Sequence, residues 1–199
     1  MPRNDAQIDW KDGRYVVPDR PAVPFFPGDG IGPEVMDAAI PVLDAAVRRA
    51  YGGQRAIGWF EVPAAGKAAA AGLDLLPADT LDTIRRHRIA IKGPTMTPVG
   101  SGHRSINVAL RQALDLYANV RPVRYFEGVA APVVNPAAVD IVIFRENTED
   151  VYAGIEFAAG SERARHLGTL LGEWGSHIPD DAGLGIKVVS REKSRRLVR

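Results

Sequence analysis

Short apolar runs alternate along the chain with longer segments in which apolar residues recur at helical spacing. Five runs predict strands, at residues 23–26, 57–62, 89–91, 139–144 and 185–189. The periodic segments predict helices over residues 33–50, 77–88, 105–117 and 167–174, and from residue 190 onward. The run at 139–144 is apolar at nearly every position, which is typical of a buried strand. Because helices alternate with short strands, the pattern predicts an α/β fold.

A glycine-rich turn leads into the first predicted helix. Residues 27–33 are Pro-Gly-Asp-Gly-Ile-Gly-Pro, and Pro33 with Glu34 suits a first helical turn. Proline loses no hydrogen bond there, and the acid faces the positive end of the helix dipole. The apolar face of this helix is expected at Val35, Ala39, Val42, Ala46 and Ala50. Pro41 interrupts the pattern and predicts a kink or a break.

The composition is that of an ordinary globular protein. Of the 199 residues, 46% are hydrophobic and 25% are charged, and the formal net charge is +1. This balance provides enough apolar material for a core and argues against a nucleic-acid partner. The absence of cysteine excludes disulfides and cysteine-ligated metal sites. No apolar run is long enough to cross a bilayer and no signal segment is visible, so we expect a soluble, cytoplasmic protein without membrane association.

Positive charge is concentrated in one part of this nearly neutral chain. Residues 85–125 contain eight lysines and arginines and a single acid, Asp115. Such a local excess favours a site for a small anion, whereas the alternative is a solvated basic surface.

The helix predicted after Ser105 carries polar groups suited to an anion. Ser105 is expected as its N-cap, and its apolar face is expected at Ile106, Leu110, Ala113, Leu114 and Tyr117. Asn107 and Arg111 are four positions apart and share a face. The hydroxyl, the amide and the helix-start N–H groups would favour an anion, to which Arg111 offers a two-pronged hydrogen bond. The alternative is a capped helix with an ordinary surface arginine.

Two further arginines and a tyrosine lie at positions where site residues are common. Arg121 precedes Pro122, which favours an extended backbone and a stiffly held guanidinium. Arg145 closes the apolar run at 139–144, and Tyr152 follows as a candidate general acid or base. A strand-edge arginine, a salt-bridged turn and a core tyrosine are the structural alternatives. Arginines with serine, asparagine and tyrosine suit an acid that has several carboxylates.

Other common catalytic motifs are missing from the sequence. The glycines at 28, 30 and 32 precede a helix without the spacing of a dinucleotide-binding loop. There is no phosphate-binding P-loop motif and no serine nucleophile elbow. The four histidines have no zinc-ligand spacing, so we expect no zinc site.

Seven stretches carry a resemblance to a known family. They are Pro-Gly-Asp-Gly-Ile-Gly-Pro-Glu at 27–34, Ala-Ile-Lys-Gly-Pro at 90–94, Thr-Pro-Val-Gly at 97–100, Arg-Ser-Ile-Asn-Val-Ala-Leu-Arg-Gln at 104–112, Leu-Asp-Leu-Tyr at 114–117, Arg-Pro-Val-Arg-Tyr at 121–125 and Ile-Phe-Arg-Glu-Asn-Thr-Glu-Asp-Val-Tyr-Ala-Gly-Ile-Glu at 143–156. Through them the chain resembles the isocitrate and isopropylmalate dehydrogenase family of decarboxylating β-hydroxyacid dehydrogenases. The likeness is greatest to its bacterial, NADP-dependent isocitrate branch.

This resemblance implies how the substrate would be held. Ser105 and Asn107 would contact the carboxylate that distinguishes isocitrate from isopropylmalate. The remaining carboxylates would be clamped by Arg111, Arg121 and Arg145. A polar Ser-x-Asn pair also speaks against the isopropylmalate branch, because an isopropyl group requires an apolar wall.

The resemblance also implies roles in proton transfer, cofactor binding and regulation. Tyr152 would protonate the enolate that remains after carbon dioxide leaves. The nicotinamide end of NADP would lie near Lys92, Met96 and Thr97, although Met96 stands where the nearest relatives have threonine. A regulatory kinase that phosphorylates Ser105 would add charge that repels the substrate.

The resemblance covers only the N-terminal half of the family's chain and implies an incomplete isocitrate/isopropylmalate dehydrogenase-like fold. The catalytic lysine and the ligands for Mg²⁺ or Mn²⁺ would lie in the other half, so we expect the chain to be inactive alone. Four parts are expected: the N-terminal part of a large α/β domain at 1–116, the start of a small domain at 117–150, a clasp-like dimerisation segment of a homodimer at 151–186 and a truncated return to the small domain at 187–199.

Two alternatives remain open at this point. The chain could be a non-catalytic fragment that binds a tricarboxylate or dimerises with a full-length partner. It could also belong to the homoisocitrate dehydrogenase branch, because homoisocitrate is a tricarboxylate as well.

Overall fold

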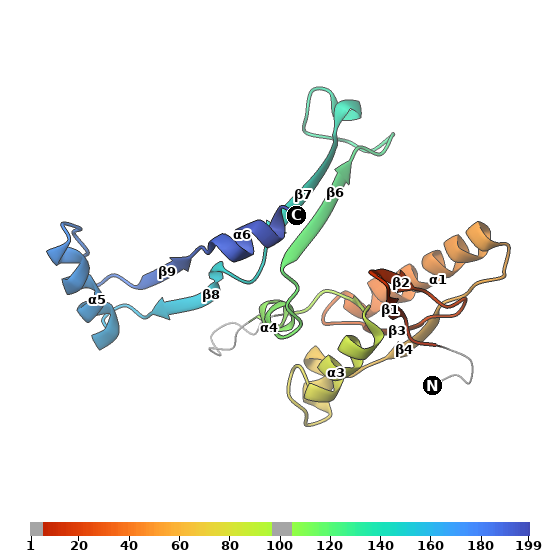
Figure 1. Ribbon diagram of the computed structural model, residues 1–199, viewed down its shortest axis with the longest axis horizontal. Coiled ribbons are helices and arrows are strands. Elements are labelled where there is room, and N and C mark those ends of the chain that lie inside the picture. The colour runs from red at the N-terminus through yellow and green to blue at the C-terminus, as the bar shows by residue number, and fades with distance from the viewer. Residues whose placement is uncertain (1–5, 97–104) are drawn as a thin grey trace. The chain divides into compact units, whose positions relative to one another are not determined.

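The computed structural model describes residues 6–96 and 105–199, arranged in two compact units (Figure 1). The first unit is Met1–Leu114 and the second is Asp115–Arg199. Among the described residues, no helix is long and apolar enough to cross a membrane.

A three-stranded parallel sheet forms the centre of the first unit. Strand β3 (Ala22–Phe26) lies between β4 (Gly58–Glu61) and β5 (Ile91–Lys92), and both neighbours pair with it in parallel. The accompanying helices are α1 (Gly32–Tyr51), α2 (Ala65–Ala70), α3 (Ala78–His87) and α4 (Ile106–Ala113). Strands connected through helices confirm the predicted α/β class.

The hydrophobic core of this unit lies between the sheet and helices α3 and α4. It consists of Phe26, Val62, Ala64, Ile84 and Leu110, with Phe60, Leu76, Leu81, Ala90 and Leu114 packed against it. Phe26 is 1% exposed, and full burial of such a side chain contributes about 2–3 kcal/mol. This packing fixes the start of α4 and the end of β3 in one unit.

Helix α1 corrects two predictions. It runs from Gly32 to Tyr51 without a break at Pro41, because the exposed proline removes a single N–H from a long helix. The expected apolar face is also wrong, since four of its five residues are exposed. The face that packs inward is Met36, Ile40, Leu43 and Val47. Its side chains are larger than the alanines of the expected face, and burying them removes more apolar surface from water.

A hairpin precedes the sheet and was not predicted. Strands β1 (Asp9–Lys11) and β2 (Arg14–Val16) pair antiparallel across a two-residue turn. Asp12 and Gly13 both have positive φ, 51° and 76°. An Asp-Gly turn of this kind matches the twist of the two strands.

The second unit contains two antiparallel ribbons and two helices. Strand β6 (Ala118–Arg124) pairs with β7 (Asp140–Glu146), and a short 3₁₀ turn, η1 (Pro136–Ala138), precedes β7. Strand β8 (Asp150–Phe157) pairs with β9 (Leu184–Val188), with α5 (Glu162–Glu173) between them in the chain. Helix α6 (Arg191–Leu197) ends the chain.

The second unit also corrects two predictions. Residues 139–144 form a strand as expected, but the strand is not buried, since Phe144 is 57% and Val142 52% exposed. Among the described residues, β6 is the partner strand of β7, and most positions of the two strands are exposed. Tyr117 was placed on the helix at 105–117, but α4 ends at Ala113 and Asp115 takes positive φ, 49°. Tyr117 therefore belongs to the segment that leads into β6.

Candidate functional site

Two loops of the first unit cross in close contact at the end of the parallel sheet. The Asp29 N–H donates to the Pro94 carbonyl at 2.7 Å, and the Gly93 N–H donates to the Phe26 carbonyl at 2.9 Å. A Cβ on Gly93 would lie 1.7 Å from the Pro27 oxygen. Glycine is required here because two backbones touch, and the segment after β5 is thereby fixed against the glycine-rich turn.

The carboxylate of Asp29 links this crossing to its surroundings. Its Oδ1 accepts from the Gly66 N–H and its Oδ2 from the Met96 N–H, both at 2.8 Å. Met96 itself is exposed, and Thr97 lies outside the described residues. The structure therefore gives the predicted cofactor segment a rigid support, which sequence reasoning missed because the partners of Asp29 are distant in the chain.

The remaining predicted residues of the first unit lie on β5 and α4. Ser105 occupies the N-cap position of α4, but its side chain makes no capping hydrogen bond. Partial desolvation lowers the pKa of Lys92, and the positive charge of Arg111 lowers it further. Arg111 therefore acts electrostatically on Lys92, so the structure brings these two cations into one neighbourhood.

Two buried polar atoms near these residues have no hydrogen-bond partner. They are Thr95 Oγ1 and Asn107 Oδ1. Buried polar atoms are normally satisfied, and an unsatisfied one is costly. Rotating the Asn107 amide by 180° would present N–H donors at the same place, since the amide orientation is assigned from hydrogen bonding. The described residues here therefore fit a polar ligand.

In the second unit, the strand register places two predicted arginines on one face of the β6–β7 ribbon. Arg121 pairs opposite Ile143, and Arg145 pairs opposite Asn119. Paired residues share a face and alternate residues along a strand return to it, so Arg121 and Arg145 are diagonal neighbours. The Nε–H of Arg121 also donates to Asn119 Oδ1 at 3.0 Å. Two guanidiniums held side by side form a cationic face suited to carboxylates.

Tyr152 lies next to this face. The Arg145 guanidinium carbon is 4.7 Å from the centre of the Tyr152 ring. A guanidinium at this distance from a ring face is attracted to it. The structure thus brings Arg121, Arg145 and Tyr152 together within the second unit.

The ribbon base is anchored by a second set of contacts. Arg196 of α6 makes two hydrogen bonds to the Asp115 carboxylate, at 2.7 and 3.0 Å, and stacks 4.5 Å from the Tyr117 ring centre. The bond to Asp115 raises the pKa of Arg196. Asn147, which is 3% exposed, donates to the Leu116 carbonyl at 3.3 Å. These contacts hold α6 and the end of β7 against the start of β6.

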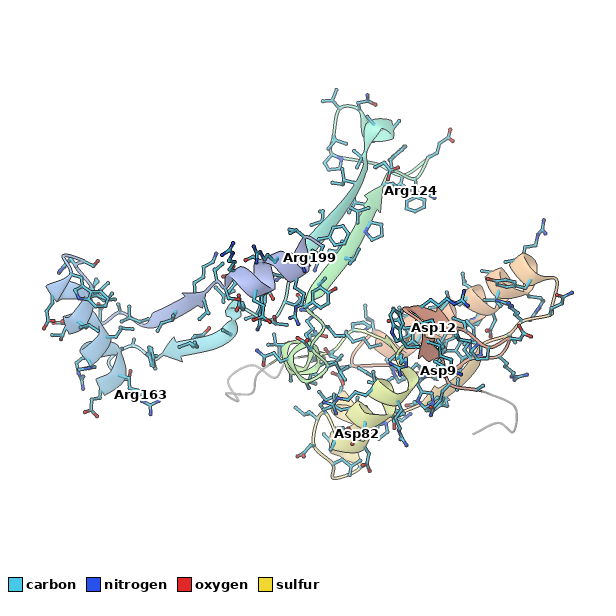
Figure 2. All side chains as sticks on the ribbon, in the orientation of Figure 1. Asp9, Asp12, Asp82, Arg124, Arg163 and Arg199 are labelled. Atoms are coloured by element: carbon cyan, nitrogen blue, oxygen red, sulfur yellow. The ribbon has the colours of Figure 1, made fainter. Side chains whose placement is uncertain are left out.

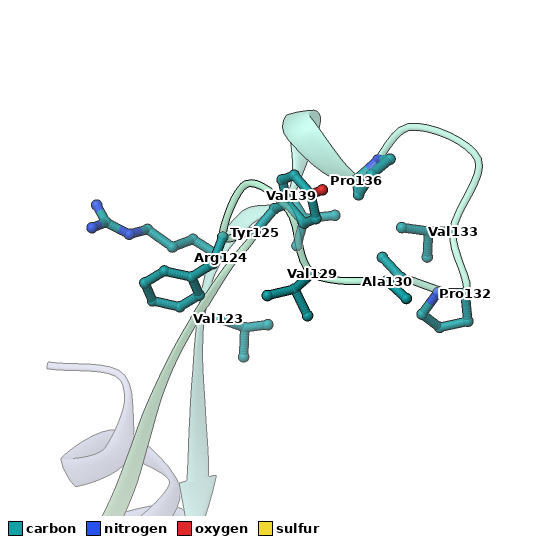
Figure 3. A pocket seen from close by; sticks show the side chains of 11 residues that line it. Val123, Arg124, Tyr125, Val129, Ala130, Pro132, Val133, Pro136 and Val139 are labelled. Carbon is teal, nitrogen blue, oxygen red and sulfur yellow. The ribbon is translucent and has the colours of Figure 1, made fainter.

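A pocket of about 280 Å³ lies at the opposite end of the same ribbon (Figure 3). Valines and prolines dominate its lining, and the side chain of Arg124 extends away from it (Figure 3). Such a lining offers nothing that recognises a carboxylate, so this pocket is chemically distinct from the cationic face.

The described residues do not fit a divalent metal ion. Nowhere in the ranges 6–96 and 105–199 do three histidine, aspartate or glutamate side chains gather to bind one. Mg²⁺ and Mn²⁺ require several oxygen ligands, so no chemical step is assigned to a metal held by these residues.

The chain contains a parallel sheet with accompanying helices, and it contains an antiparallel ribbon with two arginines on one face. These features define it as an α/β protein with a cationic site. The chain belongs to the isocitrate/isopropylmalate dehydrogenase family, whose model matches residues 22–199. This match confirms the resemblance drawn from the sequence.

Individual relatives agree with this family. An Archaeoglobus fulgidus protein named isocitrate dehydrogenase [NADP] is 51% identical over all of this chain and 48% of its own length. A Staphylococcus epidermidis protein of the same name is 53% identical, over 95% of this chain and 46% of its own. The crystal structure of isocitrate dehydrogenase from Methylococcus capsulatus gives a TM-score of 0.68 at 40% identity, covering 89% of this chain and 45% of that one. The chain therefore spans about half the length of the curated relatives it matches.

Proposed function

We propose that the chain is part of an NADP-dependent isocitrate dehydrogenase, which converts isocitrate to 2-oxoglutarate and carbon dioxide. The observation that carries this proposal is the diagonal placement of Arg121 and Arg145 on one ribbon face, with Tyr152 stacked beside Arg145. The names of the relatives support the choice of substrate and cofactor.

In the proposed reaction, the arginines bind and orient the substrate. Arg121 and Arg145 each donate two hydrogen bonds to a carboxylate. Arg111 is also proposed to bind a carboxylate. NADP, when bound, would supply the acceptor for the hydride on the carbon that carries the substrate hydroxyl. Lys92, Met96 and Thr97 would hold its nicotinamide end.

Tyr152 is proposed as the proton donor. Loss of carbon dioxide leaves an enolate, and the Tyr152 phenol gives its proton to the enolate carbon. The guanidinium of Arg145 stabilises the phenolate that results, because it lies 4.7 Å from the ring centre. The same residue thus binds a carboxylate and assists proton transfer.

Ser105 and Asn107 are proposed to select the substrate. The Ser105 hydroxyl is not used as a helix cap, and Asn107 holds a buried polar atom without a partner. With the Asn107 amide rotated so that its NH₂ group faces the substrate, an isopropyl group would leave those donors unsatisfied, whereas a carboxylate would accept from them. We therefore expect isocitrate to bind more tightly than isopropylmalate.

Isothermal titration calorimetry of the chain with isocitrate tests the proposal. Wild type should show saturable binding, and Arg121→Gln should weaken it by about tenfold or more, the effect of removing a charged hydrogen bond. Arg124→Gln is the matched control, because Arg124 lies on the other face at the end of β6 (Figure 2). Absence of binding by wild type, or equal losses in the two variants, would contradict the proposal.

The 199 residues alone are expected to produce no NADPH from isocitrate, even with Mg²⁺ present. The described residues do not fit a metal, and a metal polarises the carbonyl during decarboxylation. NADPH production by the purified chain, followed by absorbance, would overturn this part of the proposal.

We also propose that residues 151–186 form a clasp that joins two copies of the chain. Ile155 pairs opposite Ile186, and these side chains are 38% and 41% exposed on one face of the β8–β9 ribbon. Trp174, just after α5, is 71% exposed. Exposed apolar surface of this kind is typical of an interaction site.

A further inference from the structure

The turn between β7 and β8 is organised around the carboxylate of Glu146. The Thr148 N–H donates to both carboxylate oxygens, at 2.8 and 2.9 Å, and the Thr148 hydroxyl donates to Oε1 at 2.6 Å. The Glu149 N–H donates to Oε2 at 2.8 Å. Three donors therefore converge on one ionised group, and hydrogen bonds to a charged acceptor are the strong ones.

This turn lies between the two side chains of the proposed chemistry. Arg145 is the residue before Glu146, and Tyr152 is the third residue of β8. The far side of the turn is tied down as well, since Glu149 Oε2 accepts from the Ser190 N–H at 2.7 Å and Asp150 pairs with Lys187 at 2.9 Å. The turn thus sets the direction in which the chain continues from β7 into β8.

Strand pairing does not fix Tyr152. The β8–β9 ladder pairs Asp150 with Val188 and resumes at Ile155 with Ile186, so β8 is irregular between them. Tyr152 falls inside this irregular stretch. The preceding turn does contact it directly, since the Tyr152 N–H donates to the Glu149 carbonyl at 3.2 Å.

We propose that Glu146 is a positioning residue that holds the Arg145 guanidinium against the Tyr152 ring. The consequence for catalysis rests on the proposed function. The positioning of Arg145 does not, because it is a property of the turn. A carboxylate is required, because the Thr148 N–H faces both of its oxygens and would meet the NH₂ group of a glutamine whichever way the amide is turned. Glu146→Gln therefore breaks the turn with almost no change in side-chain size.

Nuclear magnetic resonance of the full chain measures this positioning without any ligand. Protons on the Arg145 side chain above an aromatic ring are shifted upfield, and Tyr152→Leu identifies that contribution. In Glu146→Gln these signals should move toward random-coil values. Glu156→Gln is the matched control, an exposed glutamate further along β8, and should leave them in place.

Calorimetry with isocitrate on the same proteins measures the consequence for the site. Glu146→Gln should weaken binding by about tenfold, because a displaced guanidinium no longer meets its carboxylate, whereas Glu156→Gln should bind like wild type. Unmoved Arg145 signals in Glu146→Gln overturn the inference. Unchanged affinity in a variant whose signals have moved overturns it too.

The two ideas fail in different ways. If wild type binds no isocitrate, the proposed function fails. The nuclear magnetic resonance measurement still decides whether Glu146 positions Arg145. If Glu146→Gln does not fold by circular dichroism, Thr148→Val replaces it, since it removes one hydroxyl bond to the same carboxylate. Its Arg145 signals should shift in the same direction by a smaller amount, and signals that stay in place overturn the inference.

Discussion

Gly93 has no space for a side chain, and a single methyl group there should be costly. Its Cβ would lie 1.7 Å from the Pro27 oxygen, a backbone atom that cannot rotate away. We expect Gly93→Ala to lower the free energy of unfolding by roughly 3 kcal/mol, the upper range for overpacking. Urea unfolding measures this loss in the free energy of unfolding.

The matched control for this variant is Gly172→Ala. Gly172 lies in α5, where a Cβ would meet nothing within 4 Å. Alanine should stabilise that helix by about 0.5 kcal/mol, because glycine is the weaker helix former. If Gly93→Ala unfolds at the wild-type urea concentration, the crossing of the two loops is looser than described.

Glu146 should also make stability depend on pH. Burial acts to raise its pKa, but the hydrogen bonds from Thr148 and Glu149 outweigh it, so the pKa lies below the ordinary value of 4.5. The ionised carboxylate therefore stabilises the fold above pH 4.5, and this contribution is lost as the pH falls through the lower folded value. The free energy of unfolding of wild type should exceed that of Glu146→Gln at pH 7, and the difference should shrink below pH 4.5. A difference that is constant between pH 7 and pH 3 in urea unfolding would contradict this explanation.

Single residues differ in how far the sequence can reveal them. Arg121 and Arg145 could be proposed from strand ends and a following proline, and their common face follows from alternation once the register is known. Glu146 could be seen only as part of an acidic turn. Asp29 gives no local signal, because it binds backbone N–H groups 37 and 67 residues away.

Serine occupies the N-cap position of three helices but does not form a capping hydrogen bond in all of them. Ser161 and Ser190 both occupy N-caps and accept a hydrogen bond from the backbone, at 3.2 Å from Ala164 and Lys193 respectively. Ser105 occupies the N-cap of α4 without such a bond. The serine of α4 is therefore available for the proposed substrate contact.

This difference predicts unequal effects on stability. Ser161→Ala should cost about 1 kcal/mol, the usual value of a capping hydrogen bond. Ser105→Ala, the control, should change the free energy of unfolding by less than about 0.5 kcal/mol. Thermal unfolding compares the two. Equal costs would mean that Ser105 caps its helix after all.

At the level of elements, periodicity located most helices and strands but not their exposed and buried faces. The strands at 23–26, 57–62 and 185–189 and the helix at 77–88 agree with the structure within a few residues. The face of α1 was assigned wrongly, because apolar residues lie on more than one side of that helix. The exposure of β7 could not be predicted, since sequence shows that a strand is apolar but not what covers it.

The two units differ in how well they bury apolar surface. The large apolar residues of the described core lie in the first unit, whereas β6, β7, β8 and β9 all carry exposed valine, isoleucine or phenylalanine. Surface of this kind is costly in water. The proposed clasp would remove part of it by pairing two copies.

Sedimentation velocity tests this pairing. Wild type should sediment as a dimer at micromolar concentration, and Ile155→Glu should weaken the dimer by tenfold or more, because it places a charge in an apolar interface (about 1.4 kcal/mol for each tenfold change). Val35→Glu on α1 is the control, an apolar site of similar exposure (45% against 38% for Ile155) outside the proposed clasp. A monomeric wild type, or equal weakening in both variants, would contradict the clasp.

The crossing of the two glycine loops has a kinetic consequence. Its Asp29–Met96 bond joins groups 67 residues apart, whereas the β1–β2 hairpin closes over two residues. Long-range closure is slow because the chain loses more entropy before any contact forms. During refolding, we therefore expect this crossing to form after the hairpin, and the Met96 amide hydrogen to become shielded from solvent exchange later than those of β1 and β2.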